Sequence, residues 1–275
     1  MQALSFGAAM AVTNSERAAY LEFAEATVTA AGLVTLPYFR VKVAVENKRE
    51  GAGFDPVTAA DRAAETLIRE ALAQDHPEHG IYGEEFGLQS GNGLTWVIDP
   101  IDGTRAFIMG QLHWGVLLGL FDGDRPIVGA CHQPYVGETF YGDTHSAWLR
   151  KGDHQERLAT RRCERLDDAI LGSTGSEWFT AAKLQQFNRL FNRVKLRKFG
   201  GDCYIYCLLA MGFIDLVVES GLQAYDIQAL IPIVEGAGGV VTDWQGGNPS
   251  LGGDVIASGD PRLHEAALRE LAANG

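Results

Sequence analysis

The sequence predicts a globular protein that mixes α-helices with β-strands. Of its 275 residues, 46% are hydrophobic and 33 are glycines, a composition typical of a folded chain with many turns. Between His113 and Leu149, apolar stretches alternate with Asp-Gly, proline and glycine turn signals, which predicts an antiparallel meander. Beyond residue 150, strand-like and helix-like segments alternate. We therefore expect a mixed α+β or α/β fold, as one domain or as two closely packed halves, residues 1–150 and 151–275.

Two helices are expected in the N-terminal part. Small and apolar residues recur at helical spacing between Ser15 and Phe39, which predicts a long first helix. A second helix is expected after Thr58, because Thr58 and Asp61 have the spacing of a capping box. The apolar positions that follow fall on one helix face: Ala64, Leu67, Ile68 and Leu72.

The segment between these helices contains two candidate functional residues. Residues 46–54, ENKREGAGF, are polar and contain glycine, so they predict a loop. Lys48 in this loop is either a solvated lysine or a cation that closes over a phosphorylated substrate. Asp55 stands just before the second helix and, unlike Asp61, has no capping role, which makes it a candidate for contact with a metal ion or water.

The C-terminal part predicts three strands and three helices. Strands are expected near Ile170, at Val194–Arg197 and at Ile214–Glu219. Helices are expected at Lys183–Phe191, after Asp202, and from Tyr225 to about Ala237, with Asp226 at the start of the last one. The glycine pattern of GAGGVVTDWQGG is too wide for a dinucleotide fingerprint and follows a helix, so nucleotide binding is not expected there.

The most informative stretch is WVIDPIDGTR, residues 96–105. An apolar run ends at Asp99, and Pro100 predicts that the chain turns there. Asp102 follows three residues later, and hard cations such as Mg²⁺ prefer carboxylate and carbonyl oxygens, here including the carbonyl of Ile101. A helix that begins at Gly103 or Thr104 would direct its free N–H groups toward a phosphate held at the same place.

Other interpretations of this stretch remain open at this point. An Asp-Gly pair after an apolar run is often only a turn. The DxDGT motif of phosphatases that form an aspartyl-phosphate does not match, because Asp99 and Asp102 are one residue too far apart. The expected nucleophile is therefore a water molecule activated by metal. Glu84 and Glu85, at the end of a predicted strand at Ile81 and Tyr82, could supply one further ligand.

Composition also limits the possible partners. The formal net charge of −12 argues against nucleic acid, since a phosphate backbone requires basic patches. The four cysteines, at positions 131, 163, 203 and 207, lack zinc spacing and are expected to be reduced packing residues of a cytoplasmic protein. Neither a signal peptide nor a membrane span is expected. Three histidines of the meander, His113, His132 and His145, are expected to be structural or exposed.

Taken together, four motifs resemble the ordered signature of the inositol monophosphatase superfamily. They are DPVTAAD with Asp55, GEE with Glu84, DPIDGT with Asp99 and Asp102, and YDIQALIPIVEGAGG with Asp226. The resemblance implies a layered αβαβα sandwich of the inositol monophosphatase / fructose-1,6-bisphosphatase type. It also implies a magnesium-dependent hydrolase of small phosphate monoesters, often dimeric, with two or three Mg²⁺ ions per active site. Tyr225 stands where the family usually has tryptophan, for which we expect only a packing change.

The resemblance also implies roles for individual residues. Glu84, Asp99, the carbonyl of Ile101, Asp102 and Asp226 would hold the metal ions, most of them in the N-terminal half of the chain. Thr104, with Asp55 behind it, would orient the attacking water, and Glu84, Thr104 and Asp55 would form the catalytic set. The amides of Gly103 and Thr104 would bind phosphate, with Lys48 as a further candidate.

The substrate prediction rests on other residues. The strings TRAFIMGQLHWG, KFGGDCYIY and VVESGLQAYD resemble the histidinol-phosphate phosphatase branch more than the inositol branch. Histidinol phosphate carries an ammonium group, which Asp202 and Glu219 could pair with, although Asp202 could also be a helix cap and Glu219 a surface acid. Arg197 is a weaker substrate-binding candidate. The alternatives are an inositol monophosphatase, a phosphatase of broad specificity, and a catalytically silent metal-binding protein.

Overall fold

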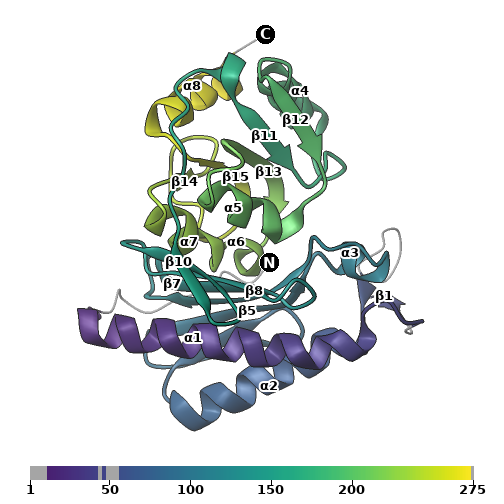
Figure 1. The fold of residues 1–275 in the computed structure, drawn as a ribbon, viewed down its shortest axis with the longest axis vertical. Helices are drawn as coiled ribbons and strands as arrows, with labels where there is room; N and C mark the ends of the chain where they lie inside the picture. Colours follow the sequence, from purple (N-terminus) through teal and green to yellow (C-terminus); the bar gives the residue numbers. More distant parts are fainter. Residues whose placement is uncertain (1–10, 43–44, 48–55, 274–275) are drawn as a thin grey trace.

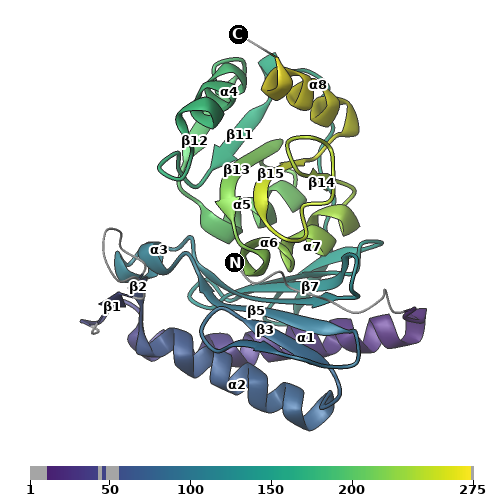
Figure 2. The same ribbon diagram turned by 180° about the vertical axis from the view of Figure 1, so that it is seen from behind.

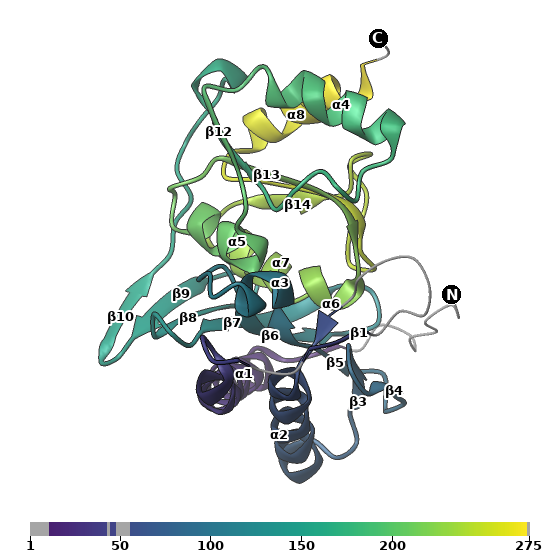
Figure 3. The same cartoon turned by 90° about the vertical axis from the view of Figure 1, so that its right-hand side faces the viewer.

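The chain folds into five alternating layers of helices and strands, as the resemblance implies (Figure 3). The computed structural model describes residues 11–42, 45–47 and 56–273. At one end, α1 (Asn14–Thr35) and α2 (Ala59–Asp75) cover an eight-stranded sheet. Three helices separate this sheet from a five-stranded one, and α4 (Ala181–Phe191) and α8 (Pro261–Ala272) cover the far side (Figure 1). The expected αβαβα sandwich is confirmed.

The two N-terminal helices form where the sequence predicts them. Thr58 caps α2 in a capping box with Asp61, whose Oδ2 accepts hydrogen bonds from the Thr58 amide at 2.8 Å and hydroxyl at 2.6 Å. The first helix ends at Thr35 and gives way to a short 3-10 helix, Leu36–Tyr38, because Pro37 cannot donate a backbone hydrogen bond. Both helices pack their small and apolar faces on the sheet around Trp96.

The eight-stranded sheet has the order β10-β9-β8-β7-β6-β5-β3-β4. Only β3 and β5 run parallel among these neighbours, so the meander predicted for residues 113–149 is confirmed as antiparallel. The strands are β3 (Gly80–Gly83), β4 (Gly87–Gln89), β5 (Thr95–Asp102), β6 (Gly115–Phe121), β7 (Pro126–Gln133), β8 (Glu138–Gly142), β9 (Ala147–Lys151) and β10 (His154–Arg157).

The turn predicted at Asp99 does not occur. Strand β5 continues to Asp102 and stays paired with β6, and its register shifts between Asp99 and Asp102. A bulge of this kind accommodates Pro100, which has no N–H to give to the ladder. The bulge therefore keeps two acids at the end of one buried strand, and the chain turns only at Gly103.

The five-stranded sheet has the order β12-β11-β13-β15-β14 and mixes parallel with antiparallel pairs. Its strands are β11 (Ile170–Ser173), β12 (Leu196–Phe199), β13 (Leu216–Leu222), β14 (Val240–Thr242) and β15 (Gly253–Ser258). Strand β12 begins two residues later than expected, since Val194 is buried in the core below α4 instead of joining the sheet.

The middle layer contains α5 (Asp202–Ala210), α6 (Ala224–Ile227) and α7 (Leu230–Gly236). The single helix predicted from Tyr225 to Ala237 is wrong, because the chain breaks into α6 and α7 at Gln228 and Ala229. Pro232 explains the break, since in one continuous helix its ring would clash with the carbonyl of Gln228. A core cluster that includes Leu117, Cys131, Val217 and Val255 joins this layer to both sheets.

The remaining elements lie beside the end of β5. Strands β1 (Glu46–Asn47) and β2 (Pro56–Val57) pair with each other, and α3 (Thr104–Ile108) follows Gly103. Lys48 and Asp55 lie outside the described residues. The proposed boundary at residue 150 falls within β9, so the division into halves stays a proposal. No helix of the described residues is long and apolar enough to span a membrane.

Candidate active site

Three aspartates converge where β5 meets the middle layer. Asp99 and Asp102 come from the end of β5, and Asp226 comes from α6, which packs against that strand (Figure 2). One carboxylate oxygen from each lies within 4.8 Å of the others. The bulge in β5 explains why two acids of one strand can point to the same place, because it changes the side-chain alternation between them.

The electrostatics of this acidic cluster are unusual. Burial, followed by the nearby Glu84 carboxylate, raises the pKa of Asp99 well above its usual range, and burial also raises the pKa of Asp226. Burial raises the pKa of Asp102 to about 6, although the Cys203 amide donates to its Oδ2 at 2.6 Å and opposes the shift. None of the described lysines or arginines offsets these charges.

Two buried polar atoms without a hydrogen-bond partner indicate that the acidic cluster binds a further group. Asp99 Oδ1 and the Tyr206 hydroxyl are buried and have no hydrogen-bond partner among the described residues. Both residues line one pocket of about 240 Å³, together with Glu84, Asp102 and Asp226. Unpaired buried carboxylates are costly, and oxygen atoms of this kind are the ligands that hard divalent cations prefer. The residues present therefore fit a divalent metal ion.

The start of α3 forms one wall of the pocket. Gly103 has φ of +81°, and a Cβ there would lie 2.6 Å from the carbonyl oxygen of His113, so only glycine fits. Thr104 follows as the first residue of the helix, and its hydroxyl donates to the Ile101 carbonyl at 3.0 Å. This turn brings Ile101 and the residues of the predicted phosphate site, Gly103 and Thr104, to the pocket.

The start of α5 lies beside the start of α3, since a Cβ on Gly103 would be 3.1 Å from the Asp202 Cβ, and it also lines the pocket. Asp202 adopts φ of +44°, a strained conformation for a residue other than glycine, and burial raises its pKa to about 8. Glu219 lies in the middle of β13, where the amide of Thr174 donates to its Oε1 at 2.7 Å. Burial raises the pKa of Glu219 to about 8 as well. Both substrate-binding candidates thus line the same pocket as the acidic cluster.

The structure does not bring every predicted site residue together. Glu84 lines the pocket beside Asp99, outside the tight group of three. Arg197 lies on the edge strand β12, where its guanidinium donates to the Phe191 carbonyl at 2.7 Å, and it is not among the pocket residues. The roles expected of Lys48 and Asp55 fall outside the described residues.

The histidines and cysteines are mostly where the sequence analysis expected them. His132 is buried and bonded to the Thr139 hydroxyl at 2.8 Å, and His145 is exposed. The four cysteines are free thiols, three of them buried, but Cys203 also contributes its amide to the site.

Several pocket residues were missed by the sequence analysis. Arg105 follows Thr104 directly, so its place in the motif was a usable signal. Glu177 and Trp178 belong to the loop between β11 and α4, and only tertiary packing brings that loop to the pocket.

Comparison with known proteins agrees with this geometry. The family model described as the inositol monophosphatase family matches residues 16–275. The bifunctional phosphatase IMPL2 of Arabidopsis thaliana chloroplasts is 36% identical over 272 residues, covering 94% of this chain and 77% of its own. A histidinol-phosphatase of Streptomyces coelicolor is 33% identical over 256 residues, covering 90% of this chain and 95% of its own.

A solved structure of a similar protein supports the same family. The structure of an inositol monophosphatase from Zymomonas mobilis matches with a TM-score of 0.83 and 38% identity, covering 93% of this chain and 98% of that one. The matched region contains the described elements of both sheets and the acidic cluster between them. The chain therefore belongs to the inositol monophosphatase family of metal-dependent phosphatases.

Proposed function

We propose that this protein is a magnesium-dependent phosphomonoesterase that hydrolyses L-histidinol phosphate to L-histidinol and phosphate, a step of histidine biosynthesis. The observation that carries the proposal is that two further acids, Asp202 and Glu219, line the same pocket as the three aspartates of the acidic cluster. An ammonium group on the substrate would pair with these acids and favour their ionised form, whereas a neutral polyol would supply no positive charge to them.

The relatives support the same class of substrate. Besides the Streptomyces protein, a histidinol-phosphatase of Mycobacterium tuberculosis is 33% identical over 220 residues. The second candidate function is hydrolysis of inositol 1-phosphate or of several small phosphate esters, and the likeness to the Zymomonas inositol monophosphatase favours it. The two candidates share the metal chemistry and differ in what Asp202 and Glu219 contact.

Asp99, Asp102, Asp226, Glu84 and the Ile101 carbonyl would hold the metal ions. Magnesium suits them because every donor is a hard oxygen. Bound divalent cations would neutralise these acids and the phosphate oxygens and would acidify water. The count of two or three ions, the homodimer and the cytoplasmic location stay predictions that rest on the family.

Other groups of this chain would orient an acidic side chain, the attacking water and the phosphate. The Cys203 amide holds Asp102 in one orientation through its 2.6 Å hydrogen bond, so this carboxylate needs no reorganisation when substrate arrives. The Thr104 hydroxyl, already within reach of the Ile101 carbonyl, would orient the attacking water together with Asp55. The amides of Gly103 and Thr104 would donate to the phosphate oxygens.

Phosphate release from histidinol phosphate and from inositol 1-phosphate, each with Mg²⁺ and with an EDTA control, tests the proposal. We expect a preference for histidinol phosphate of about a hundredfold or more in kcat/KM, close to 3 kcal/mol of transition-state binding. Comparable rates would overturn the substrate assignment and leave the phosphatase chemistry standing.

Substitutions at Asp202 and Glu219 test whether these two acids cause the preference for histidinol phosphate. Asp202→Asn and Glu219→Gln keep the size of each side chain and remove its charge, so each should lower kcat/KM for histidinol phosphate more than for inositol 1-phosphate. Glu156→Gln is the matched control, because Glu156 is an exposed acid on β10 and outside the pocket. An equal loss with both substrates would show that these acids only maintain the site.

A further inference from the structure

One wall of the pocket has no role in the chemistry proposed so far. It is formed by Glu177 and Trp178, on the loop of residues 174–180 between β11 and α4. Trp178 is 45% exposed, which is unusual for the largest apolar side chain, and it borders a pocket otherwise rich in acids. A tryptophan kept at such a place needs an explanation other than core packing.

The loop that carries Trp178 is braced at several points. At its start the Thr174 amide donates to Glu219, and at its end Thr180 caps α4 through the Lys183 amide at 3.3 Å. Phe179, next to Trp178, packs its ring against Phe187 with centroids 4.9 Å apart. The backbone of Trp178 also lies against Gly221, where an added Cβ would be 3.5 Å from the Trp178 Cβ. Trp178 is therefore a positioned residue.

The indole face already holds a flat cation. The guanidinium carbon of Arg105 lies 4.5 Å from the Trp178 ring centroid, and Arg105 Nη1 lies 3.6 Å from Glu177 Oε1. An aromatic face and a carboxylate together suit a planar, positively charged group, through cation–π attraction and ion pairing. The same wall offers nothing comparable to a neutral polyol, whose hydroxyl groups would lose water against the indole.

We propose that Trp178, assisted by Glu177, is a specificity-determining residue that stacks on a planar ring of the leaving group that gains positive charge on protonation, which for histidinol phosphate is the imidazole. This inference rests on the proposed function and deepens it. The ring takes the place of the Arg105 guanidinium on the indole face. Arg105 follows Thr104 at the start of α3. Once it leaves the indole face, its guanidinium is therefore close to the expected phosphate position and can donate N–H groups to the phosphate. Asp202 and Glu219 bind the ammonium group at the same time.

Two pairs of phosphate esters separate the contribution of the ring to kcat/KM from that of the amine. Histidinol phosphate and 2-aminopropyl phosphate both carry the amine, and only the first has a ring. An amine-free pair, 3-(imidazol-4-yl)propyl phosphate and propyl phosphate, isolates the ring alone. The quantity measured is the ring preference, the ratio of kcat/KM within each pair, and we expect about tenfold in the Mg²⁺-loaded protein.

Trp178→Leu should reduce the ring preference in both pairs to less than about threefold, and Trp178→Phe should retain most of it because an aromatic face remains. Phe213→Leu is the matched control, since Phe213 is 60% exposed and does not line the pocket. It should leave the ring preference unchanged. Thermal unfolding with and without Mg²⁺ verifies that each variant is folded and binds metal.

The outcomes separate this inference from the proposed function. A ring preference that survives in Trp178→Leu, or that falls equally in Phe213→Leu, overturns the role of Trp178. Equal hydrolysis of inositol 1-phosphate and histidinol phosphate by the wild type overturns the proposed function instead. In that case the amine-free pair still decides whether Trp178 selects for a ring.

Discussion

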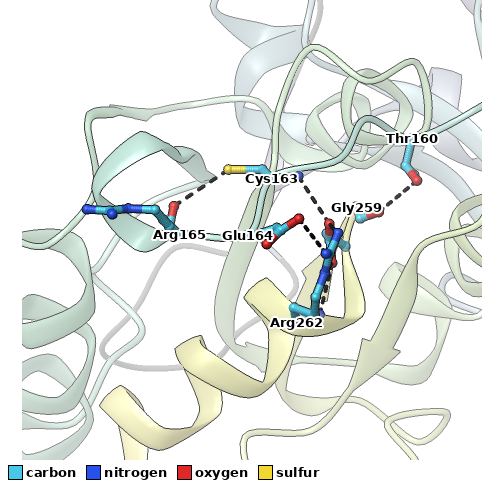
Figure 4. A network of polar contacts seen from close by, with 7 residues as sticks. Thr160, Cys163, Glu164, Arg165, Gly259 and Arg262 are labelled. Atoms are coloured by element: carbon cyan, nitrogen blue, oxygen red, sulfur yellow. Dashed lines mark hydrogen bonds and ion pairs between the residues drawn. The ribbon is translucent and has the colours of Figure 1, made fainter.

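Buried acids occur in two regions of this molecule, and they are treated in opposite ways. Just before β13, Asp215 is completely buried and accepts two hydrogen bonds from Arg161 of the segment that connects the two sheets, at 2.7 and 2.5 Å, and one from the Ile170 amide at 2.7 Å. Nearby, Asp260 accepts from Arg262 at 2.8 Å and from the Cys163 amide at 3.2 Å. Figure 4 shows Cys163 and Arg262 in this network of polar contacts. These acids have cationic partners supplied by the chain.

The acids of the pocket have no such partner. Within the part of the chain that the structure describes, no lysine or arginine compensates Asp99, Asp102 or Asp226, and each of the three pKa values is raised, chiefly by burial. By contrast, hydrogen bonding to Arg262 lowers the pKa of Asp260. Burial alone therefore does not distinguish the two regions, because both bury carboxylates.

The difference indicates which acids serve structure and which serve chemistry. An acid that joins two segments is most stable with a permanent counter-ion, since breaking a buried pair leaves an uncompensated charge. An acid that binds a dissociable metal ion cannot have one, because the counter-ion would compete with the metal. The lack of a cationic partner is thus a mark of function that can be read from the geometry.

The largest effect is expected from Asp99→Asn. This change removes a carboxylate from the acidic cluster and should lower kcat by about 1000-fold or more, roughly 4 kcal/mol. Because it also removes like-charge repulsion, the metal-free variant should be as stable as the wild type or more so. Phosphate release and urea unfolding in EDTA measure the two quantities. Substantial turnover in this variant would refute the assignment of Asp99 as a metal ligand.

Asp215→Asn is expected to lower the stability of the protein and to leave its kcat unchanged. The substitution removes the charged partner of Arg161, whose side chain is 42% exposed and stays partly solvated, so it should reduce the free energy of unfolding by about 1.5–3 kcal/mol. The kcat of the folded fraction should stay close to that of the wild type, since Asp215 is not among the pocket residues. Chemical denaturation and single-substrate kinetics provide the measurements, and a loss below about 1 kcal/mol would contradict the structural role.

The gain in stability on adding Mg²⁺ should differ between Asp99→Asn and Asp215→Asn. Mg²⁺ at about 100 times its dissociation constant should stabilise the wild type by about 2.7 kcal/mol, provided that the unfolded chain does not bind it. Asp99→Asn should lose most of this gain, and Asp215→Asn should keep it, although it starts from a lower stability. Thermal unfolding with EDTA and with Mg²⁺ is the measurement. A gain of the same size in Asp99→Asn would show that the ion binds elsewhere.

The parts of the site that sequence could predict are those with a local cause. Asp99, Asp102, Gly103 and Thr104 are adjacent in the chain, and a buried strand followed by a glycine with positive φ determines their arrangement. The capping box of Thr58 and Asp61 is equally local. Its position at the start of a predicted helix suited Asp226 to be either a cap or a ligand, and the local pattern could not decide, because α6 reaches β5 by tertiary packing.

The remaining features depend on contacts that no local pattern encodes. The bulge in β5 was missed because proline is a turn signal in general, and only the pairing with β6 keeps the strand intact beyond Pro100. Trp178 and Arg105 meet across 73 residues of chain, so their stacking could not be inferred from spacing. Arg197 had the right charge for a substrate site, but the edge strand directs it to Phe191.

The smallest expected effect is on the pH dependence of stability, which should have opposite sign in the two regions. The pKa of Glu219 is raised to about 8 from 4.5, so the folded metal-free protein holds this proton more tightly than the unfolded chain. The resulting stability is fully present below pH 4.5 and is lost as the pH rises toward 8. The pKa of Asp260 is lowered from 3.8, so its contribution is present above pH 3.8 and is lost as the pH falls further.

Urea unfolding in EDTA across pH 3 to 8 compares two charge-removing variants. Glu219→Gln should gain stability relative to the wild type as the pH rises from 4.5 to 8, because it removes an acid whose ionisation is costly in the folded protein. Asp260→Asn should be destabilised at neutral pH, and the difference from the wild type should shrink in strong acid. Parallel pH profiles for the two variants would mean that Glu219, like Asp260, has a compensating partner, and the distinction between the two regions would then fail at this residue.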